Sequence, residues 1–548
     1  MVSGMVMSLS RIQIVFPELN RTVEADPGDN LLAIMREHRI PIKADCGGVG
    51  RCGLCKVIID KTSRLACMTH VLNDAEVFLP STQADEDYQI LVDYQDIEVS
   101  PEQLNPVPDK AGDSCAYAIA VDLGTTTVVG KLIDIRTGLE IDSFAQLNSQ
   151  RAFGADVISR INIAQEDASE LSGLITSQLD TLIASLLKKH HIGKERIQKL
   201  VLAGNTVMSY LLLNLPCSSL GASPFKPEFK IKETYSWEEV FRTQTLNCNC
   251  FILPFFSAFV GGDLAAGLCS LRAEDDFILL DMGTNGEILF KRKERLLCTA
   301  TAVGPAFEGG SIECGSGSVR GAISAVRYED GEFRYRTIGA APANSICGSG
   351  ILDLMAVLLQ QGFIDSTGLM TIKPPDGRIV ISREDGKLDC GEPGGGEPGG
   401  GESGGGESGG GESGGKTGTA SVFFTQKDIR QFQLAKGAIR TGIEIICEEM
   451  GGDPPKRIYL AGGFGQNLDP QSAIVTGLLP ERFHDRIFAI GNSSLNGVVK
   501  ICLNESIQNS IADLTKTGHE INLAVHHHFN DLFMEHMSFE RISAKLEV

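Results

Sequence analysis

Four cysteines near the start of the chain have a spacing that suits an iron–sulfur cluster. Their pattern is Cys46-x5-Cys52-x2-Cys55-x11-Cys67. Four thiolates from one loop and one following segment can hold two bridged irons, and the glycines between them let the loop turn its N–H groups toward the sulfurs. A zinc site is the alternative, but zinc favours two separated Cys pairs, and only one Cys-x2-Cys pair is present. We therefore predict that these cysteines bind a 2Fe–2S cluster.

The elements around these cysteines must form a small sheet with one helix. Residues 11–25 alternate between apolar and polar, which predicts two short strands joined by a turn. Asp29 or Asn30 can cap a helix that runs to about Arg39, and a further strand is expected at 56–59. Strand, turn, strand, helix, cysteine loop and strand is the order of a β-grasp ferredoxin.

The residues around the cysteines resemble those of 2Fe–2S ferredoxins. The matching stretches are Ala44-Asp45-Cys46-Gly47-Gly48 and Arg51-Cys52-Gly53-Leu54-Cys55. The first gap of five residues departs from the plant-type gap of four and is closer to the adrenodoxin class, and the short last gap departs from both. We expect a ferredoxin-like domain over 9–92 and a Pro-rich polar linker over 93–115.

Two similar motifs further along the chain combine an aspartate with glycine and threonine. Asp122-Leu-Gly-Thr-Thr-Thr and Asp281-Met-Gly-Thr-Asn-Gly each follow a short apolar strand. An aspartate at a strand end can hold Mg²⁺, while the glycine and the hydroxyl and N–H groups can approach phosphate. A single such turn is ordinary hairpin chemistry, but two copies, followed by the turn Gly462-Gly463-Phe464-Gly465, indicate a duplicated nucleotide-binding fold.

This set of motifs resembles the actin, sugar-kinase and heat-shock-chaperone superfamily. The resemblance implies a duplicated RNase H-like α/β ATPase fold, with a first half over 116–212, a second half over 213–548, and ATP with Mg²⁺ between them. The residues that it implies are Asp122, Gly124, Thr125, Thr126 and Thr127 for the first phosphate loop, Asp281, Gly283, Thr284 and Asn285 for the second, and Gly462, Gly463 and Gly465 for adenosine. Either Asp122 or Asp281 would orient the attacking water. Asp263 and Glu308, near predicted turns, suit loop hydrogen bonding as well as catalysis.

One segment of the second half has low complexity. Residues 391–415 are Gly-rich with Glu at every fifth position, a composition that buries too little apolar surface to fold. Residues 410–417 match the phosphate-loop pattern formally, but a repeat precedes them where a strand is required. We expect a flexible surface insertion with no nucleotide role.

Length and composition exclude several classes of protein. The chain has 548 residues and a formal net charge of −21, which predicts several domains and argues against nucleic-acid binding. It shows neither an apolar run of membrane-spanning length nor a signal peptide. Fifteen cysteines without an export signal indicate a reducing, cytoplasmic location.

The combination of a ferredoxin-like domain with an ATPase fold is narrow, and the whole chain resembles the reductive activators of corrinoid proteins. The motifs that carry this resemblance are the cysteine loop at 44–55, the two Asp-Gly-Thr motifs, Ala203-Gly-Asn-Thr, Gly304-Pro-Ala-Phe-Glu-Gly, Cys347-Gly-Ser-Gly-Ile-Leu-Asp and Ala461-Gly-Gly-Phe-Gly. The resemblance implies ATP-dependent transfer of an electron from the cluster, which converts an inactive Co(II) corrinoid to active Co(I). It also implies a corrinoid protein partner such as a methyltransferase component, a low-potential electron donor, and a homodimer, since members tend to be dimers.

Other functions compete with this reading. An activator of another radical or dehydratase enzyme would also use ATP and a cluster, but such activators usually lack an N-terminal ferredoxin domain. A small-molecule kinase would give the cluster no purpose. A non-enzymatic electron carrier with a degenerate nucleotide fold would have no need of both Asp122 and Asp281.

Overall fold

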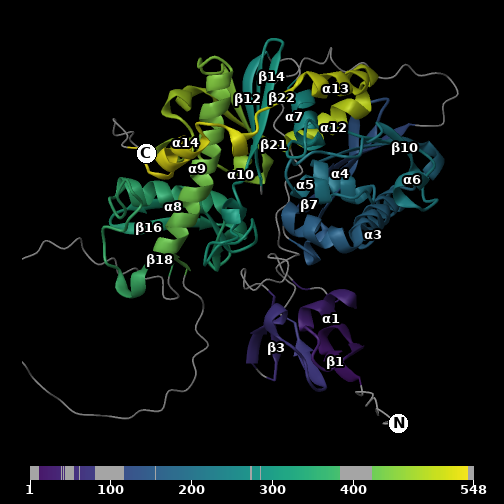
Figure 1. Cartoon of the computed structure of the whole chain (residues 1–548), viewed down its shortest axis with the longest axis horizontal. Helices are drawn as coiled ribbons and strands as arrows, with labels where there is room; N and C mark the ends of the chain where they lie inside the picture. The colour runs from purple at the N-terminus through teal and green to yellow at the C-terminus, as the bar shows by residue number, and fades with distance from the viewer. Residues whose placement is uncertain are drawn as a thin grey trace, which may run out of the picture.

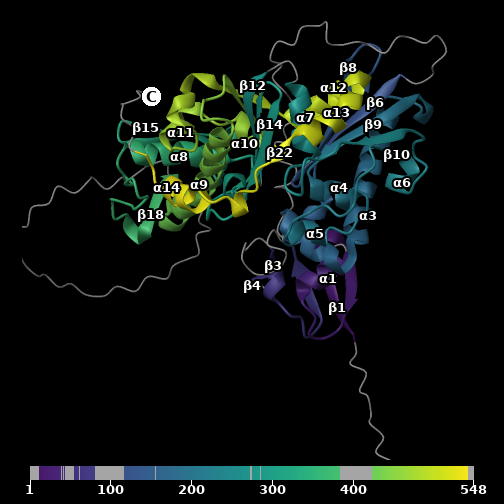
Figure 2. The same ribbon diagram turned by 45° about the horizontal axis from the view of Figure 1, so that its top comes forward.

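A computed structural model shows an N-terminal domain beside two larger α/β units (Figures 1 and 2). It describes residues 11–38, 40, 42, 55–60, 62–79, 116–154, 156–271, 275–283, 285–382 and 422–540. The expected linker at 93–115 and the Gly/Glu repeat at 391–415 lie outside the described residues. The described strands form three sheets of five or six strands and two smaller ones.

The N-terminal domain has the predicted β-grasp arrangement. Its elements are β1 (Ile12–Phe16), β2 (Arg21–Ala25), α1 (Leu31–Glu37), β3 (Lys56–Ile59), β4 (Thr62–Leu65) and β5 (Ala75–Phe78). The sheet order is β2-β1-β5-β3-β4, and β1 runs parallel to β5. Asn30 caps α1, because its side-chain oxygen accepts hydrogen bonds from the N–H groups of Leu32 and Ala33. The apolar face of α1 packs on the sheet to form a separate core.

The first α/β unit is a six-stranded sheet in the order β10-β11-β9-β6-β7-β8. Its strands are β6 (Tyr117–Leu123), β7 (Thr127–Asp134), β8 (Leu139–Leu147), β9 (Ile197–Gly204), β10 (Thr234–Ser236) and β11 (Asn249–Ile252). Its helices are α3 (Val157–Lys189), α4 (Thr206–Leu212), α5 (Ser218–Gly221) and α6 (Trp237–Phe241). Because β11 pairs in parallel with β9, this sheet continues beyond residue 212, where we expected the first half to end.

The second α/β unit repeats the same plan in the order β21-β20-β12-β13-β14-β22. Its strands are β12 (Asp276–Met282), β13 (Gly286–Arg292), β14 (Arg295–Thr301), β20 (Arg457–Ala461), β21 (Ile487–Gly491) and β22 (His519–Glu520). In each sheet the strand that ends in the motif aspartate is antiparallel to the next strand and parallel to a strand from much later in the chain. The duplication expected from the motifs is therefore present in the strand order.

The remaining elements cover the second sheet or join the two units. The small strands are β15 (Ala322–Glu329), β16 (Glu332–Thr337), β17 (Ser345–Ile346), β18 (Arg378–Ser382) and β19 (Val422–Thr425). The helices are α7 (Gly262–Ser270), α8 (Gly348–Gln360), α9 (Gln426–Glu449), α10 (Gly462–Gln466), α11 (Pro470–Val475), α12 (Ser493–Leu503), α13 (Glu505–Thr517) and α14 (Phe529–Met537).

Helices α7 and α12 pack against each other between the two large sheets (Figure 1). A Cβ added to Gly497 of α12 would lie 1.8 Å from the Ala266 oxygen of α7, so the two backbones are in close contact there. Val498 of α12 shares a core with Ala118 and Ala120 of β6. A helix from near the end of the chain thus completes the first unit.

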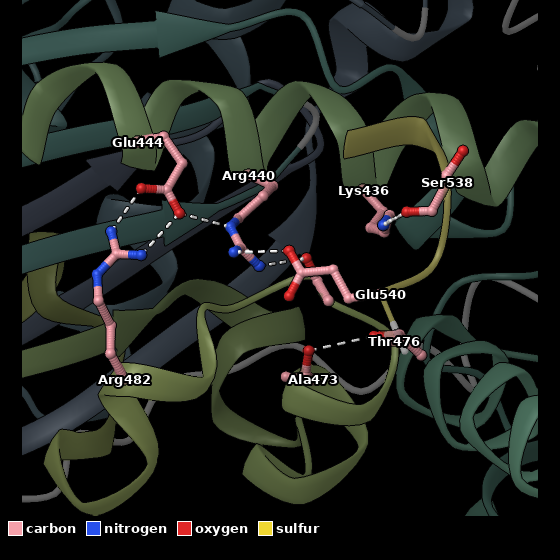
Figure 3. A network of polar contacts seen from close by, with 9 residues as sticks. Lys436, Arg440, Glu444, Ala473, Thr476, Arg482, Ser538 and Glu540 are labelled. Atoms are coloured by element: carbon pink, nitrogen blue, oxygen red, sulfur yellow. Dashed lines mark hydrogen bonds and ion pairs between the residues drawn. The ribbon is translucent and has the colours of Figure 1, made fainter. Parts of the chain in front are cut away.

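The long helix α9 carries a set of buried charged side chains on the side that faces residues 538–540 (Figure 3). The Lys436 ammonium donates to the Ser538 carbonyl at 2.7 Å. Arg440 lies 2.8 Å from Glu444 and 2.8 Å from Glu540, and Glu444 also accepts from Arg482. These contacts fix the segment that follows α14 against α9.

Candidate nucleotide cleft and cluster site

Two of the four predicted cluster ligands lie in the described part of the N-terminal domain. Cys55 directly precedes β3, and Cys67 lies in a single 3₁₀ turn, η2 (Ala66–Met68), that follows β4. The pairing of β3 with β4 brings them together, and the Ala66 N–H donates to the Cys55 carbonyl at 2.7 Å. The Asn30 side chain, which caps α1, also donates to the Cys67 carbonyl at 2.9 Å. Cys46 and Cys52 lie outside the described residues.

The geometry of the two described thiols fits ligation of one metal ion. Their sulfur atoms are 3.2 Å apart, too far for a disulfide, whose sulfurs are about 2.05 Å apart. Both residues are buried, with exposed fractions of 1% for Cys55 and 8% for Cys67. Two buried thiols that meet at one point and form no disulfide are donors that an iron of a cluster can use.

The two α/β units enclose a cleft of about 1300 Å³, open mouth included. The predicted residues that line it are Asp122, Gly124, Thr125, Thr126, Thr127, Asp281, Gly283, Asn285, Gly462 and Gly463. These residues come from three distant parts of the sequence, and the structure brings them to one place. Thr284 lies outside the described residues.

The strand register explains why the two motifs face the same cleft. In the first unit Asp122 stands beside Ala203, one residue before β9 ends at Gly204. In the second unit Asp281 stands beside Ala461, where β20 ends. The carboxyl ends of neighbouring parallel strands lie at one sheet edge, which is where α/β folds bind ligands.

The glycines of the motifs leave room for a ligand. A Cβ added to Gly463 would meet no atom within 4 Å, and one added to Gly283 would meet only the Asn285 oxygen at 4.0 Å. Gly462 has a φ of +81°, which favours glycine, and its added Cβ would lie 2.8 Å from the Asp281 carboxylate. Gly465 differs, because it is buried against Leu460 behind the lining.

The carboxylate of Asp122 is held by side chains from the far end of the chain. Its two oxygens accept hydrogen bonds from the Asn492 amide at 2.9 Å and from the Ser494 hydroxyl at 2.8 Å. Burial raises the pKa of Asp122 although these two bonds favour the charged form. Sequence reasoning missed Asn492 and Ser494, and no local pattern marks them.

The Asp281 carboxylate has a different environment. No described residue donates a hydrogen bond to it or pairs with it. Burial, together with the negative charge of Asp122, raises the pKa of Asp281 to about 7. A half-buried carboxylate with open lone pairs at the cleft wall suits a ligand that brings positive charge or a proton.

Two further carboxylates lie beside Asp281. Burial, and next the charge of Asp281, raises the pKa of Asp263 to about 7. Burial raises the pKa of Glu287 well above its usual value, and Glu287 shares a hydrogen bond with Asp263. From the sequence, Asp263 was one of two carboxylates equally suited to catalysis and to loop hydrogen bonding. The sequence did not identify Glu287 as a site residue. The hairpin register, which places Asp281 opposite Glu287, is the signal that would have found it.

The two sides of the cleft also touch directly. The Thr126 hydroxyl of the first phosphate loop donates to the Glu308 carboxylate of the second unit at 3.4 Å. Glu308, the other carboxylate left open, therefore lies in the cleft lining. The aromatic rings of Phe307 and Phe464 stack beside it, with centroids 4.4 Å apart.

The described part of the chain has neither a metal-binding cluster of side chains nor a membrane-spanning helix. No three His, Cys, Asp or Glu side chains there converge on a point where they would hold a metal ion. A Mg²⁺ ion in the cleft would therefore take most of its ligands from phosphate and water, which is common for Mg²⁺. None of the described helices is both long and apolar enough to cross a membrane.

Family models match most of the chain. The 2Fe–2S iron–sulfur cluster binding domain matches residues 15–76. The middle region of RACo matches residues 117–275, and the C-terminal ASKHA domain of RACo matches residues 275–389 and 412–547. The gap in the last match falls on the Gly/Glu repeat.

Individual relatives agree with these matches. The chain is 27% identical to the corrinoid activation enzyme RamQ of Eubacterium limosum, with 96% of this chain and 99% of that protein covered. It is 22% identical to a [Co(II) methylated amine-specific corrinoid protein] reductase of Methanosarcina barkeri, over 77% of each. A solved reductive activator for a corrinoid, iron–sulfur protein superposes with a TM-score of 0.64 at 24% identity, over 96% of this chain and 98% of that one. The superposition shows a shared fold.

Proposed function

We infer that this chain, which belongs to the family of reductive activators of corrinoid proteins, uses ATP to drive the reduction of a corrinoid protein from inactive Co(II) to active Co(I). The observation that carries this proposal is the presence, in one chain, of a cluster-binding domain and a nucleotide cleft built from both phosphate motifs. The full-length similarity to a corrinoid activation enzyme supports it.

The residues that would hold the cluster are Cys46, Cys52, Cys55 and Cys67. A bound 2Fe–2S cluster supplies one-electron transfer. The contribution of the chain is to bury Cys55 and Cys67 and to fix their backbone through the β3–β4 pairing and the Asn30 amide. Fixed backbone around the thiolates keeps the ligand geometry constant.

We assign different roles to the two motif aspartates. Asp122 already accepts hydrogen bonds on both carboxylate oxygens, so it organises the cleft through Asn492 and Ser494. Asp281 has lone pairs open toward the cleft and is the better candidate to orient the attacking water or to contact Mg²⁺. The N–H groups of Gly124 and Gly283 already donate to the Thr127 and Asn285 carbonyls, so the N–H groups of the residues that follow them in each turn would donate to phosphate oxygens.

The adenosine would lie on the other side of the same cleft. Gly462 and Gly463 present bare backbone there, and an adenosine can pack against them. Gly465 would act indirectly, since its missing side chain lets α10 pack on β20. Nucleotide between the two units can shift their arrangement only if it binds one arrangement more tightly than another. A bond such as Thr126–Glu308, which spans the cleft, is the kind of contact that such a shift changes.

The identity of the corrinoid partner, the electron donor and the oligomeric state are proposed by analogy with the family. The corrinoid partner would be a methyltransferase component, and a low-potential electron donor would reduce the cluster. The chain would act as a homodimer. The described cysteines form no disulfide, which supports the proposal of a reducing, cytoplasmic location.

An anaerobic assay tests the proposed function. The protein with reduced cluster is mixed with a Co(II) corrinoid protein, and the absorption of Co(I) is followed with MgATP, without ATP, and with Asp281→Asn. We expect Co(I) to form with ATP and its rate to fall roughly tenfold or more in the other two conditions. Equal rates with and without ATP would contradict the coupling. ATP-dependent reduction of another acceptor, with none of the corrinoid, would place the chain with a different activator class.

A further inference from the structure

A buried arginine that the proposed function does not use lies beneath the first phosphate loop. Arg160 of α3 has an exposed fraction of 0%. Its guanidinium donates to the Thr125 carbonyl at 2.5 Å and to the Gly154 carbonyl at 2.9 Å. It also donates to the Gln150 side chain at 3.3 Å. Arg160 therefore ties the phosphate loop to the segment 148–154.

A second buried side chain makes the same connection. The Asn148 amide donates to the Gly124 carbonyl at 2.8 Å, and the Asn148 N–H donates to the Thr126 carbonyl at 2.9 Å. Asn148 then caps the 3₁₀ helix η4 (Ser149–Ala152) by accepting from the Gln150 N–H. Each of the loop residues Gly124, Thr125 and Thr126 is thus held through its carbonyl oxygen. A shift of this loop would move η4 with it.

The other end of this segment contacts the cluster domain. Arg36 of α1 donates to the Ala152 carbonyl at 3.3 Å and to the Phe153 carbonyl at 3.4 Å. Its guanidinium also lies over the Phe153 ring, 5.9 Å from the centroid. Figure 2 shows α1 directly beneath the first α/β unit.

The same helix leads back to the cluster ligands. Asn30, which caps α1, donates to the Cys67 carbonyl. Hydrogen bonds and one rigid helix therefore run from a cluster ligand to Arg36, from Arg36 to η4, and from η4 to the first phosphate loop.

We propose that the segment 148–154 is the docking surface for the cluster domain, and that Asn148 and Arg160 make this docking sensitive to nucleotide in the cleft. The proposal rests on the proposed function for its nucleotide and adds where the cluster domain is controlled. Arg160 and Asn148 are positioning residues. By reciprocity, a nucleotide that changes the docking of α1 must have its own affinity changed by the docking, by the same factor.

The test uses the full chain with its cluster and a non-hydrolysable ATP analogue with Mg²⁺. Calorimetry gives the dissociation constant, and amide hydrogen exchange is followed in residues 31–37 and 149–153 with and without the analogue. Arg36→Ala removes the docking contact. Arg11→Ala is the matched control, because Arg11 lies in the same domain, its side chain is 66% exposed, and it makes only long surface ion pairs with Glu24 at 3.6 Å and Asp26 at 3.8 Å. Arg160→Lys keeps the charge but cannot reach Thr125 and Gly154 together.

We expect the analogue to change exchange in both segments of the unaltered protein. In Arg36→Ala the response should persist in 149–153 and vanish in 31–37, with the dissociation constant changed by about fivefold. Tighter binding would mean that nucleotide releases the domain, and weaker binding that nucleotide retains it. Arg11→Ala should behave like the unaltered protein, and Arg160→Lys should weaken the response in both segments.

The outcomes separate this proposal from the proposed function. If nucleotide binds but residues 31–37 do not respond, or if Arg36→Ala leaves the dissociation constant unchanged, the docking proposal is wrong while ATP-dependent reduction stands. If exchange behaves as expected but no corrinoid protein is reduced, the proposed function fails and the coupling remains. An unaltered protein that binds no nucleotide would overturn both. Should Arg160→Lys not fold, Arg36→Ala decides alone.

Discussion

Glu444 of α9 and the cleft carboxylates Asp263 and Asp281 are all partly or fully shielded from water, but of these described residues only Glu444 has cations beside it. Glu444 lies between Arg440 and Arg482 (Figure 3). In the cleft, no described lysine or arginine pairs with Asp281 or Asp263, and both have pKa values raised to about 7. The negative charge of Glu444, which stabilises the fold, is neutralised by arginines of the same chain. The cleft carries negative charge that a bound cation or proton must neutralise, which is typical of a functional site.

The largest effect should follow from breaking the α9 network. Glu444→Gln leaves Arg440, with a side chain only 6% exposed, without one of its two carboxylates. We expect the free energy of opening of α9 to fall by about 3 kcal/mol, because an incompletely paired buried charge is costly. Native-state amide exchange in α9 measures it. Unchanged exchange would show that Glu540 alone neutralises Arg440.

The opposite result is expected when a cleft carboxylate is neutralised. The pKa of Asp281 is raised in the folded chain, so its contribution to stability is fully present below about pH 4 and is lost as pH rises to about 7. Asp281→Asn should therefore stabilise β12 and β13 by about 2 kcal/mol at pH 8 and by little at pH 4. Amide exchange in these strands at the two pH values is the measurement. Destabilisation at pH 8 would mean that a cation inside the protein already pairs with Asp281.

Lys436 is the residue of the α9 network whose pKa, like those of the cleft carboxylates, is shifted toward neutrality by burial. Burial, and next the charge of Arg440, lowers the pKa of Lys436 to about 7. Since its folded pKa lies below the unfolded value, stability should increase as pH rises from about 7 to 10. Lys436→Met should reduce that increase by about 1 kcal/mol. A slope in Lys436→Met equal to that of the unaltered protein would assign the pH dependence to another group.

The smallest effect on stability is expected for an exposed ion pair on the protein surface. Asp513 and Lys516 lie 3.1 Å apart with side chains 81% and 73% exposed. Asp513→Asn should change the free energy of opening of α13 by less than about 0.5 kcal/mol, because exposed pairs are screened by water and salt. An effect as large as that of Glu444→Gln would show that burial is not what separates the two classes of charge.

The sequence was sufficient where the chemistry is local. The β-grasp order followed from a short alternating segment and a cap at Asn30, and the capping is confirmed. The Asp122 and Asp281 motifs were found because an Asp-x-Gly turn after an apolar strand is a pattern within six residues. Their meeting in one cleft was expected from the duplication and is present in the structure.

Contacts between residues far apart in the sequence could not be predicted from local patterns. β11 has four residues, too few for a periodic pattern to assign it to the first sheet. Asn492 contacts Asp122 across 370 positions of sequence, and an asparagine before a helix is ordinarily only a cap. The roles of all the predicted site residues stay predictions, and Cys46, Cys52 and Thr284 in addition lie outside the described part of the chain.

The packing of α12 against the first sheet has a consequence for the order in which the molecule can assemble. During synthesis, β6 leaves the ribosome long before the residues that cover one of its faces and that bond Asp122, which follow 370 positions later. One apolar face of the first unit therefore stays exposed to water, and Asp122 lacks its two hydrogen-bond donors, until almost the whole chain has been made. A nascent or truncated chain that lacks residues 492–503 should expose that face, and the cleft can become competent only once synthesis is nearly finished.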